Sequence, residues 1–349
     1  MKMTFRWYGE SDPVTLSKIR QIPKMSGIVS AVYSVTVGEV WAESDIRSIK
    51  NKALQNGLEF EVVESVPVHE DIKLGLPSRE RYIENYCENI RRLASVGVKC
   101  ICYNFMPVFD WLRSELKKEL ADGSNALAYD NDTVLKLDPL KSELSLPGWD
   151  ESYDKDGLRT LMEQYQNVDE QKLWEHFAYF INKIIPVCEQ CGVNMAIHPD
   201  DPPWGIFGLP RIITGLESYK KMREINQSTK NGITLCFGSL GADPSNNIKE
   251  IITQIGCERI HFVHARNIKI TGEKNFEESA HPSECGSLDM YELLKALYKG
   301  GFDGYIRPDH GRMIWGEAGR AGYGLYDRAL GAVYLTGLWE AIEKSGRSM

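Results

Sequence analysis

The chain has 349 residues, a length that allows two average domains or one α/β barrel with additions. Its 41 Lys and Arg residues stand against 49 Asp and Glu residues, and the resulting net charge of −8 disfavours a partner made of nucleic acid. The content of 42 % hydrophobic and 26 % charged residues is that of an ordinary globular protein, so the composition excludes a chain that is disordered throughout.

The opening residues and the cysteines indicate the compartment. Residues 1–8 lack the apolar segment and the small-residue cleavage site of a secretory signal. The longest uncharged run, Met25 to Gly38, has 14 residues and is too short to cross a bilayer. We therefore expect a cytoplasmic protein with no membrane partner, in which the eight cysteines are reduced thiols.

Short segments rich in β-branched residues alternate along the chain with stretches whose apolar residues recur every three or four positions. The first pattern predicts strands and the second predicts helices. The expected strands are Thr4–Tyr8, Ile28–Ser34, Leu58–Glu64, Val98–Asn104, Val193–His198, Ile233–Phe237, Ile260–His264 and Gly304–Asp309.

Several of the helices between these strands have recognisable ends. Asn167 and Glu170 form a capping-box pattern before one helix, and Ser287 is the expected cap of another that stops at Gly300. The clearest helical stretches are Arg79–Val96, Leu173–Cys191, 288–299 and Leu325 to Ile342.

Eight strand–helix units favour a closed (β/α)₈ TIM barrel over an open doubly wound sheet. Successive expected strands begin about 24–44 residues apart, except for a gap of about 95 residues between the fourth and the fifth. We interpret the excess, residues 105–168, as an insertion on the catalytic face, a lid or an oligomer contact, within a single domain of residues 1–349. Inside it we expect a hairpin built from Leu127–Leu137 and Leu140–Pro147.

Four successive strands in the second half of the barrel each carry one side chain able to bind a metal near the strand end. These residues are His198, Cys236, His264 and Asp309. Because the carboxyl ends of barrel strands meet at one mouth, the four side chains are expected to converge there. Each residue alone is readily explained as a structural one, as a buried cysteine is in many cores. Together, two imidazoles, a thiolate and a carboxylate predict a site for a divalent transition metal.

The segments around these residues and two others form a distinctive set. They are Phe5-Arg-Trp-Tyr-Gly9, His198-Pro-Asp-Asp-Pro-Pro, Cys236-Phe-Gly-Ser, His264-Ala-Arg-Asn, Arg307-Pro-Asp-His310-Gly and Gly322-Tyr-Gly-Leu-Tyr-Asp-Arg-Ala-Leu-Gly331. In combination they resemble the bacterial D-mannonate dehydratases over nearly the whole chain. The resemblance implies a TIM barrel related to metal-dependent sugar isomerases. It also implies conversion of D-mannonate to 2-dehydro-3-deoxy-D-gluconate plus water, in hexuronate (glucuronate) catabolism.

The resemblance also implies a cofactor and an acid–base pair. The family uses Mn²⁺ or Fe²⁺, its metal ligands fall on the same four residues, and Zn²⁺ suits the same donors. Its acid–base pair falls on His310 and Tyr323, of which we expect His310 to protonate the C3 hydroxyl and Tyr323 to remove the C2 proton, with the reverse order left open. The alternatives are that His310 supports a ligand and that Tyr323 packs its loop.

An anionic sugar-acid substrate needs hydrogen-bond donors. Arg266, Asn267 and Lys269 follow the seventh expected strand and Arg307 lies on the eighth, so these four residues are the expected substrate contacts. The alternative for each is a pairing with a carboxylate of the barrel itself. We also expect a homo-oligomer, a dimer.

Two other functions compete with a dehydratase. A metal-dependent sugar isomerase or epimerase of the same fold normally builds its site from Glu and Asp, so the thiolate of Cys236 counts against it. A protein that only binds a metal or a sugar would need neither His310 nor Tyr323. The other seven cysteines are expected to be packing residues.

Overall fold

The computed structural model describes residues 1–140 and 155–346. Eight parallel strands close into a barrel in the order β1-β12-β9-β8-β7-β4-β3-β2, which confirms the predicted TIM barrel. All eight expected strands are present, and β9 has the predicted bounds. The strands are β1 (Lys2–Arg6), β2 (Gly27–Ser30), β3 (Glu59–Glu64), β4 (Cys100–Tyr103), β7 (Asn194–Ile197), β8 (Asn231–Cys236), β9 (Ile260–His264) and β12 (Tyr305–Arg307).

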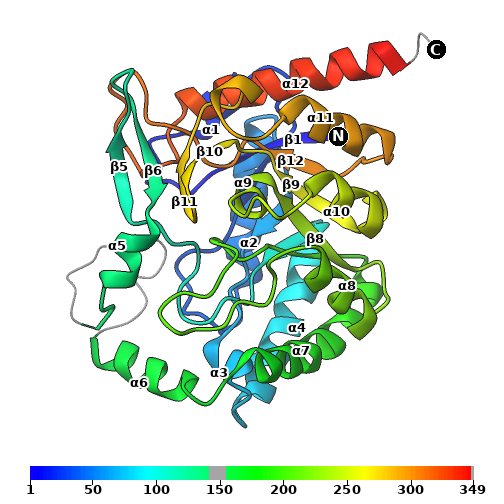
Figure 1. Ribbon diagram of the computed structural model, residues 1–349. Helices are drawn as coiled ribbons and strands as arrows, with labels where there is room; N and C mark the ends of the chain where they lie inside the picture. The colour runs from blue at the N-terminus through cyan, green and yellow to red at the C-terminus, as the bar shows by residue number, and fades with distance from the viewer. Residues whose placement is uncertain (141–154, 347–349) are drawn as a thin grey trace.

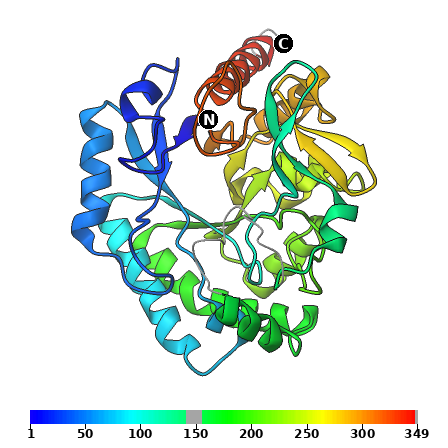
Figure 2. The same cartoon turned by 90° about the vertical axis from the view of Figure 1, so that its left-hand side faces the viewer.

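Helices surround the barrel (Figures 1 and 2). They are α1 (Leu16–Ile19), α2 (Glu43–Gln55), α3 (Glu70–Leu74), α4 (Arg79–Val96), α7 (Glu170–Cys191), α8 (Leu216–Ile225), α9 (Phe237–Gly241), α10 (Ile248–Ile255), α11 (Met290–Lys299) and α12 (Tyr326–Gly346). No helix in residues 1–140 or 155–346 has both the length and the apolar character needed to cross a membrane.

Two predicted helix caps are wrong. Helix α7 begins after Asp169, whose carboxylate accepts from the Lys172 N–H, and not with a capping box at Asn167. Helix α11 likewise begins after Asp289, while the hydroxyl of Ser287 accepts from the backbone N–H of Ile270 in a strand at the mouth of the barrel. In both cases an aspartate two residues further on competes for the cap, and a carboxylate at a helix N-terminus also gains from the helix dipole.

The predicted hairpin of the insertion is wrong in place. The hairpin consists of β5 (Glu115–Glu119) and β6 (Asn125–Tyr129). The chain then caps α5 (Asn131–Lys136) with Asp130, and residues 141–147 of the second expected strand lie outside the described residues. Strand β5 was not predicted because its sequence is almost entirely charged. Its side chains alternate between exposed and half-buried, as is typical of an edge strand.

The hairpin joins a second sheet at the mouth of the barrel. Strands β10 (Ile268–Gly272) and β11 (Asn275–Glu278), from the loop after β9, continue it in the order β10-β11-β6-β5. Figure 1 shows this sheet beside the barrel, and α6 (Lys155–Tyr165) completes the described insertion below it. The insertion after β4 is therefore bound to the loop after β9, although more than 100 residues separate them along the chain.

The barrel interior contains a small apolar cluster, which we call the apolar layer. It consists of Val29, Val62, Cys100, Cys102, Ala196, Phe262 and Tyr305. Alternate residues of a strand share a face, so the residues two positions after Val62, Ala196, Phe262 and Tyr305 also point inward, one step closer to the mouth. These residues are Glu64, His198, His264 and Arg307. We call them, with Cys236 and Asp309, the polar layer.

Candidate active site

Three of the four predicted metal ligands lie together in the polar layer. The ligand atoms of His198, Cys236 and His264 all lie within 4.8 Å of one another, and His198 Nε2 is 3.0 Å from His264 Nδ1. Strand register aligns Cys236 with His264 across neighbouring parallel strands, and Arg307 is aligned with His264 on the other side. His198 directly follows β7, the other neighbour of β8, so the three side chains come from the carboxyl ends of β7, β8 and β9.

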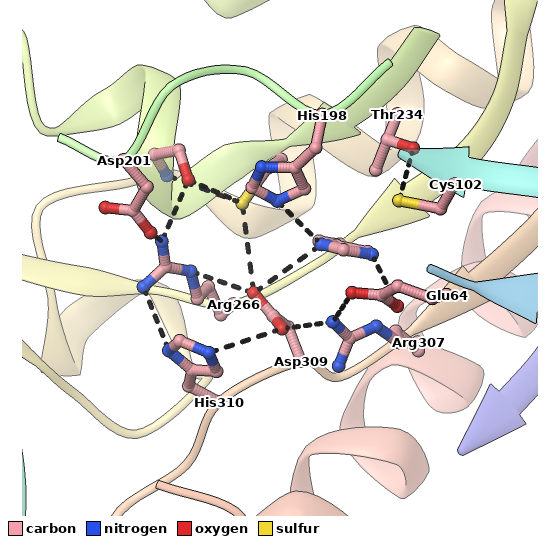
Figure 3. A network of polar contacts seen from close by, with 12 residues as sticks. Glu64, Cys102, His198, Asp201, Thr234, Arg266, Arg307, Asp309 and His310 are labelled. Carbon is pink, nitrogen blue, oxygen red and sulfur yellow. Dashed lines mark hydrogen bonds and ion pairs between the residues drawn. The ribbon is translucent and has the colours of Figure 1, made fainter. Parts of the chain in front are cut away.

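Asp309, the fourth predicted ligand, lies beside this group. Its Oδ2 is 3.8 Å from both Cys236 Sγ and His264 Nδ1. Two guanidiniums hold the carboxylate, with Arg266 Nε at 2.9 Å and Arg307 Nη2 at 2.8 Å (Figure 3). Its φ of +60° is in the left-handed region, where a residue with a Cβ is strained by about 1–3 kcal/mol. Strain of this kind is typical of functional positions.

The electrostatics of the group favour ionised ligands. Burial by itself opposes ionisation of Cys236, but Arg266 and His198 outweigh it and hold the pKa of the thiol well below its usual value. Burial likewise opposes ionisation of Asp309, but Arg307 and the other cationic groups around the carboxyl hold its pKa well below its usual range. The hydroxyl of Ser239 donates to the sulfur at 3.1 Å. A thiolate and a carboxylate are thus stable here without protons.

The resulting negative charge attracts a cation. Burial lowers the pKa of His198, but the Cys236 thiolate and Asp309 raise it to about 9, so a proton on His198 balances the anions. A divalent metal supplies that positive charge directly and displaces the proton. Asp309 Oδ1 faces Arg307 at 2.8 Å and His264 Nε2 faces Glu64 at 3.5 Å. The other atoms of these two groups, Asp309 Oδ2 and His264 Nδ1, face the remaining candidate ligands. Two nitrogens, one sulfur and one oxygen suit a divalent transition metal, so the residues present fit the implied ion.

A second group with metal-ligand spacing in the described residues contains Glu64, Cys102 and His264. It shares His264 with the first group. Burial and the carboxylate of Glu64 raise the pKa of Cys102 well above its usual value. A neutral thiol is a poor metal ligand, so the group containing Cys236 suits a metal better.

The predicted acid–base pair is also assembled. His310 Nε2 lies 2.7 Å from the Tyr323 hydroxyl, and both side chains are buried. The rings are in edge contact, and the indole of Trp111 lies 5.0 Å from the imidazole. Burial raises the pKa of Tyr323 well above its ordinary value, so the phenol keeps its proton.

Four buried charged side chains next to this pair contact one another. Only Arg266 among them was a predicted site residue. Arg113 Nη1 and Nη2 bind Asp201 Oδ1 and Glu278 Oε1, each at 2.9 Å. Arg266 binds the same two carboxylates, and Figure 3 shows it between Asp201 and His310. Asp201 belongs to the segment that begins at His198, which was a usable signal. Arg113 and Glu278 are isolated in the sequence and gave none.

The four expected substrate contacts differ in their bonding partners. Arg266 is fully engaged by carboxylates of the protein, which is the alternative considered for it. The amide of Asn267 bonds to backbone groups of its own loop, and Lys269 is exposed on β10. Arg307 binds Glu64 and Asp309 through Nη2 alone, and its buried Nε and Nη1 have no hydrogen-bond partner. Of the three that are buried, Arg307 has donors left for a ligand.

Arg6, at the end of β1, was also missed. Its Nη1 is 3.1 Å from Glu64 Oε2, and its Nε is buried without a hydrogen-bond partner. Beside it lies a cavity of about 190 Å³ bordered by the loops after β2 and β3, among them Tyr33, Ser65 and His69. Arg6 thus lies between this cavity and the residues that surround His264.

All eight cysteines are free thiols. Cys285 is exposed, so the expectation that every cysteine except Cys236 is a packing residue is wrong for it. Cys285 is the last residue of a short 3₁₀ helix, Ser283–Cys285.

Comparison with known proteins identifies the family. The D-mannonate dehydratase (UxuA) family profile matches residues 1–349. The chain is 59 % identical to a mannonate dehydratase of Streptococcus uberis, over 99 % of this chain and 100 % of the relative, and 57 % identical to one of Thermotoga petrophila, over 99 % and 98 %. A solved mannonate dehydratase from Streptococcus suis superposes with a TM-score of 0.92 at 47 % identity, over 99 % of this chain and 96 % of that one.

The alternative of an isomerase or epimerase has weaker support. A D-psicose 3-epimerase from Clostridium cellulolyticum matches over 100 % of this chain and 99 % of its own, but with a TM-score of 0.54 and 14 % identity. That likeness shows the shared barrel fold alone. The profile match over every residue and the full-length relatives above 50 % identity show that the chain belongs to the D-mannonate dehydratase family, a family of hydro-lyases.

Proposed function

We propose that this chain dehydrates D-mannonate to 2-dehydro-3-deoxy-D-gluconate at the polar layer, with a divalent transition metal held by His198, Cys236, His264 and Asp309. The observation that carries the proposal is the stabilised thiolate and carboxylate of Cys236 and Asp309 next to the hydrogen-bonded pair of His310 and Tyr323. Family membership supports the substrate, and through it a place in hexuronate (glucuronate) catabolism in the cytoplasm.

Mn²⁺ or Fe²⁺ fits this donor set, as Zn²⁺ does, and when bound supplies a Lewis acid that increases the acidity of the C2 proton of the substrate. The protein's own residues then have to move two protons. One leaves C2, and the other joins the C3 hydroxyl so that it departs as water.

The structure favours the reverse of the order expected from the sequence. Since the raised pKa keeps the phenol of Tyr323 protonated, it suits the acid that protonates the C3 hydroxyl. His310 Nε2 then takes the C2 proton, and the C2=C3 enol that remains tautomerises to the ketone. The 2.7 Å hydrogen bond returns the proton from His310 to the Tyr323 phenolate, which resets both groups with no net proton consumed.

The substrate has to lie between the metal ligands and the acid–base pair. Arg307 has two buried donors without partners there, and an arginine of this kind suits the substrate carboxylate. The cavity beside Arg6 suits the polyhydroxyl end of a six-carbon acid, with the free Nε of Arg6 as a donor to a hydroxyl. We therefore assign substrate binding to Arg307 and Arg6.

We also propose a dimer. The outer face of α12 and the loop before it expose Trp315, Tyr326, Leu330 and Val333, and no charged residue occurs between residues 329 and 338. Two copies with a net charge of −8 each approach best through uncharged surfaces. Light scattering after gel filtration should give twice the chain mass, and Leu330→Glu should give monomers.

The test of the proposed function is turnover. Protein stripped with a chelator under anaerobic, reducing conditions is given D-mannonate and then Mn²⁺, Fe²⁺ or Zn²⁺, and the 2-keto-3-deoxy product is measured. We expect no product from the stripped protein and recovery with at least one metal. Failure with all three metals overturns the proposal. Formation of an epimer or a ketose instead supports the isomerase alternative, and binding without turnover supports the binding protein.

A further inference from the structure

We propose that Glu278 is a positioning residue that keeps the proton of neutral His310 on Nδ1, and that Arg113 from the insertion holds Glu278 in place. The catalytic consequence rests on the proposed function, whereas the position of the proton does not. The residues involved lie in the insertion after β4, in the loop after β9 and in the loop after β12.

Glu278 is the last residue of β11 and is 1 % exposed. Its Oε1 lies 3.1 Å from His310 Nδ1, and the opposite nitrogen of the ring, Nε2, lies 2.7 Å from the Tyr323 hydroxyl. Three groups therefore lie in a chain, carboxylate, imidazole and phenol. A carboxylate accepts and does not donate, so the imidazole nitrogen that faces Glu278 has to carry the hydrogen.

The charge state of Glu278 supports this direction. Burial by itself opposes its ionisation, but Arg266, His310 and Arg113 lower the pKa of the carboxyl to about 2. Glu278 is therefore an anion throughout the neutral range. With Nδ1–H donating to it, Nε2 presents a lone pair that accepts the hydroxyl hydrogen of Tyr323 and, in turnover, the C2 proton.

Arg113 fixes the carboxylate from the other side. It is 1 % exposed, donates to Glu278 and Asp201 at 2.9 Å, and is anchored by a bond to the Leu112 carbonyl at 2.7 Å. The backbone repeats the connection, because β11 pairs with β6 of the insertion through Phe276 and Tyr129. The insertion thus reaches the acid–base pair through this salt bridge, in addition to the ring contact of Trp111 with His310.

The competing arrangement involves Arg266. Its Nη1 lies 3.4 Å from His310 Nδ1. If Arg266 donated a hydrogen bond to Nδ1, that nitrogen would carry no hydrogen, and the hydrogen of the imidazole would be on Nε2. The same Nη1, however, contacts Glu278 Oε1 much more closely. The shorter contacts therefore pair Arg266 with Glu278 and leave Nδ1–H to donate to the carboxylate.

Glu278→Gln tests this because it conserves shape and inverts the hydrogen-bond preference. The glutamine amide can donate to Nδ1, which stabilises the Nε2–H form and removes the base. By analogy with other residues that orient a catalytic histidine, we expect kcat to fall about 10²–10⁴-fold, with KM and bound metal nearly unchanged. The matched control is Glu277→Gln on the same strand, where the carboxylate pairs with Lys118 away from His310. It should retain kcat.

The decisive readout is the ¹⁵N NMR spectrum of the Zn²⁺-loaded, histidine-labelled protein, with the His310 signals assigned by loss in His310→Asn. We expect hydrogen on Nδ1 in the wild type and on Nε2 in Glu278→Gln. Hydrogen on Nε2, or on both nitrogens, in the wild type at neutral pH overturns the inference, as does a Glu278→Gln enzyme with wild-type kcat. If Glu278→Gln does not fold, the wild-type spectrum still decides, and Arg113→Lys should lower kcat about tenfold. The expected spectrum in a protein that dehydrates no sugar acid overturns only the proposed function.

Discussion

Two successive layers of the barrel interior come from the same strands and have opposite chemistry. In the apolar layer, Val62, Ala196 and Phe262 fill the barrel, and two residues further along each strand the polar layer has Glu64, His198 and His264. Strand alternation guarantees that both sets point inward. The change from apolar to ionisable side chains therefore occurs over a single step of the strand, about 6–7 Å.

The layers also differ in what they contribute to folding. Burial of the apolar layer stabilises the fold at roughly 25 cal/mol per Å² of apolar surface. The polar layer has buried ionised groups, unpartnered atoms such as Arg307 Nε, and a strained Asp309, all of which cost stability. The protein thus separates stability from chemistry along the barrel axis.

The largest effect is expected in the polar layer. Cys236→Ser replaces a stabilised thiolate with a neutral hydroxyl, so metal content should fall and turnover of D-mannonate should drop by at least about 100-fold. Metal analysis and a product assay measure this. The control is Cys100→Ser in the apolar layer, which should keep the metal and lose about 1–3 kcal/mol of unfolding free energy. Full metal content in Cys236→Ser would contradict the assigned ligand set.

A variant that separates chemistry from metal binding comes next. Tyr323→Phe removes the proposed acid without touching a ligand, so kcat should fall about 10²–10⁴-fold while metal content stays at the wild-type level. Steady-state kinetics and metal analysis on the same sample provide both numbers. Near-normal turnover would reduce Tyr323 to a packing residue of its loop.

In the apolar layer the expected loss is in stability. Phe262→Ala leaves a cavity in a fully buried site and should lower the unfolding free energy by about 3–5 kcal/mol, measured by denaturant titration. At a temperature where the variant is folded, the metal should still bind. Loss of the metal from folded Phe262→Ala would show that the two layers are coupled and not separate.

The opposite end of the barrel should respond to pH. Burial lowers the pKa of His261 to about 4. In the folded protein the neutral ring donates a hydrogen bond to the Thr229 carbonyl. In the unfolded chain this imidazole has a pKa of about 6.5. Its contribution to the unfolding free energy is therefore complete above that pH and is lost as the pH falls toward 4, by about 3 kcal/mol. Denaturation curves between pH 7 and 4 test this, and His261→Gln should flatten the dependence. An unchanged slope in the variant would assign it to other groups.

The smallest effect is expected outside both layers. Lys269 is exposed on β10, so Lys269→Gln should change KM for D-mannonate by less than about twofold. Arg307→Lys in the polar layer keeps the positive charge and should still raise KM much more, because lysine lacks the forked donors. A large KM change at Lys269 would mean that β10 moves over the mouth when substrate binds.

The barrel and the grouping of the candidate metal ligands could be predicted from the sequence. All eight strands and the convergence of His198, Cys236 and His264 follow from strand period, chain order and the closure of parallel strands, which are local or topological properties. Errors arose where neighbouring residues compete for one position, as Asp169 and Asn167 do at the start of α7. The charged strand β5 was missed for a related reason, since its pattern lacks an apolar face.

Only the tertiary structure decided how the buried charges pair. Arg113, Asp201, Glu278 and His310 come from four different loops, and nothing near any of them in the sequence names its partners. The docking of β6 on β11 brings them together, and burial then makes the pairing obligatory, because an unpaired charge inside the barrel is too costly to persist. Arg6 and Arg307 keep buried donors without partners, while Arg266 is engaged by the protein's own carboxylates. The candidate metal ligands thus follow from the order of the strands, whereas the loops determine which arginines keep free donors.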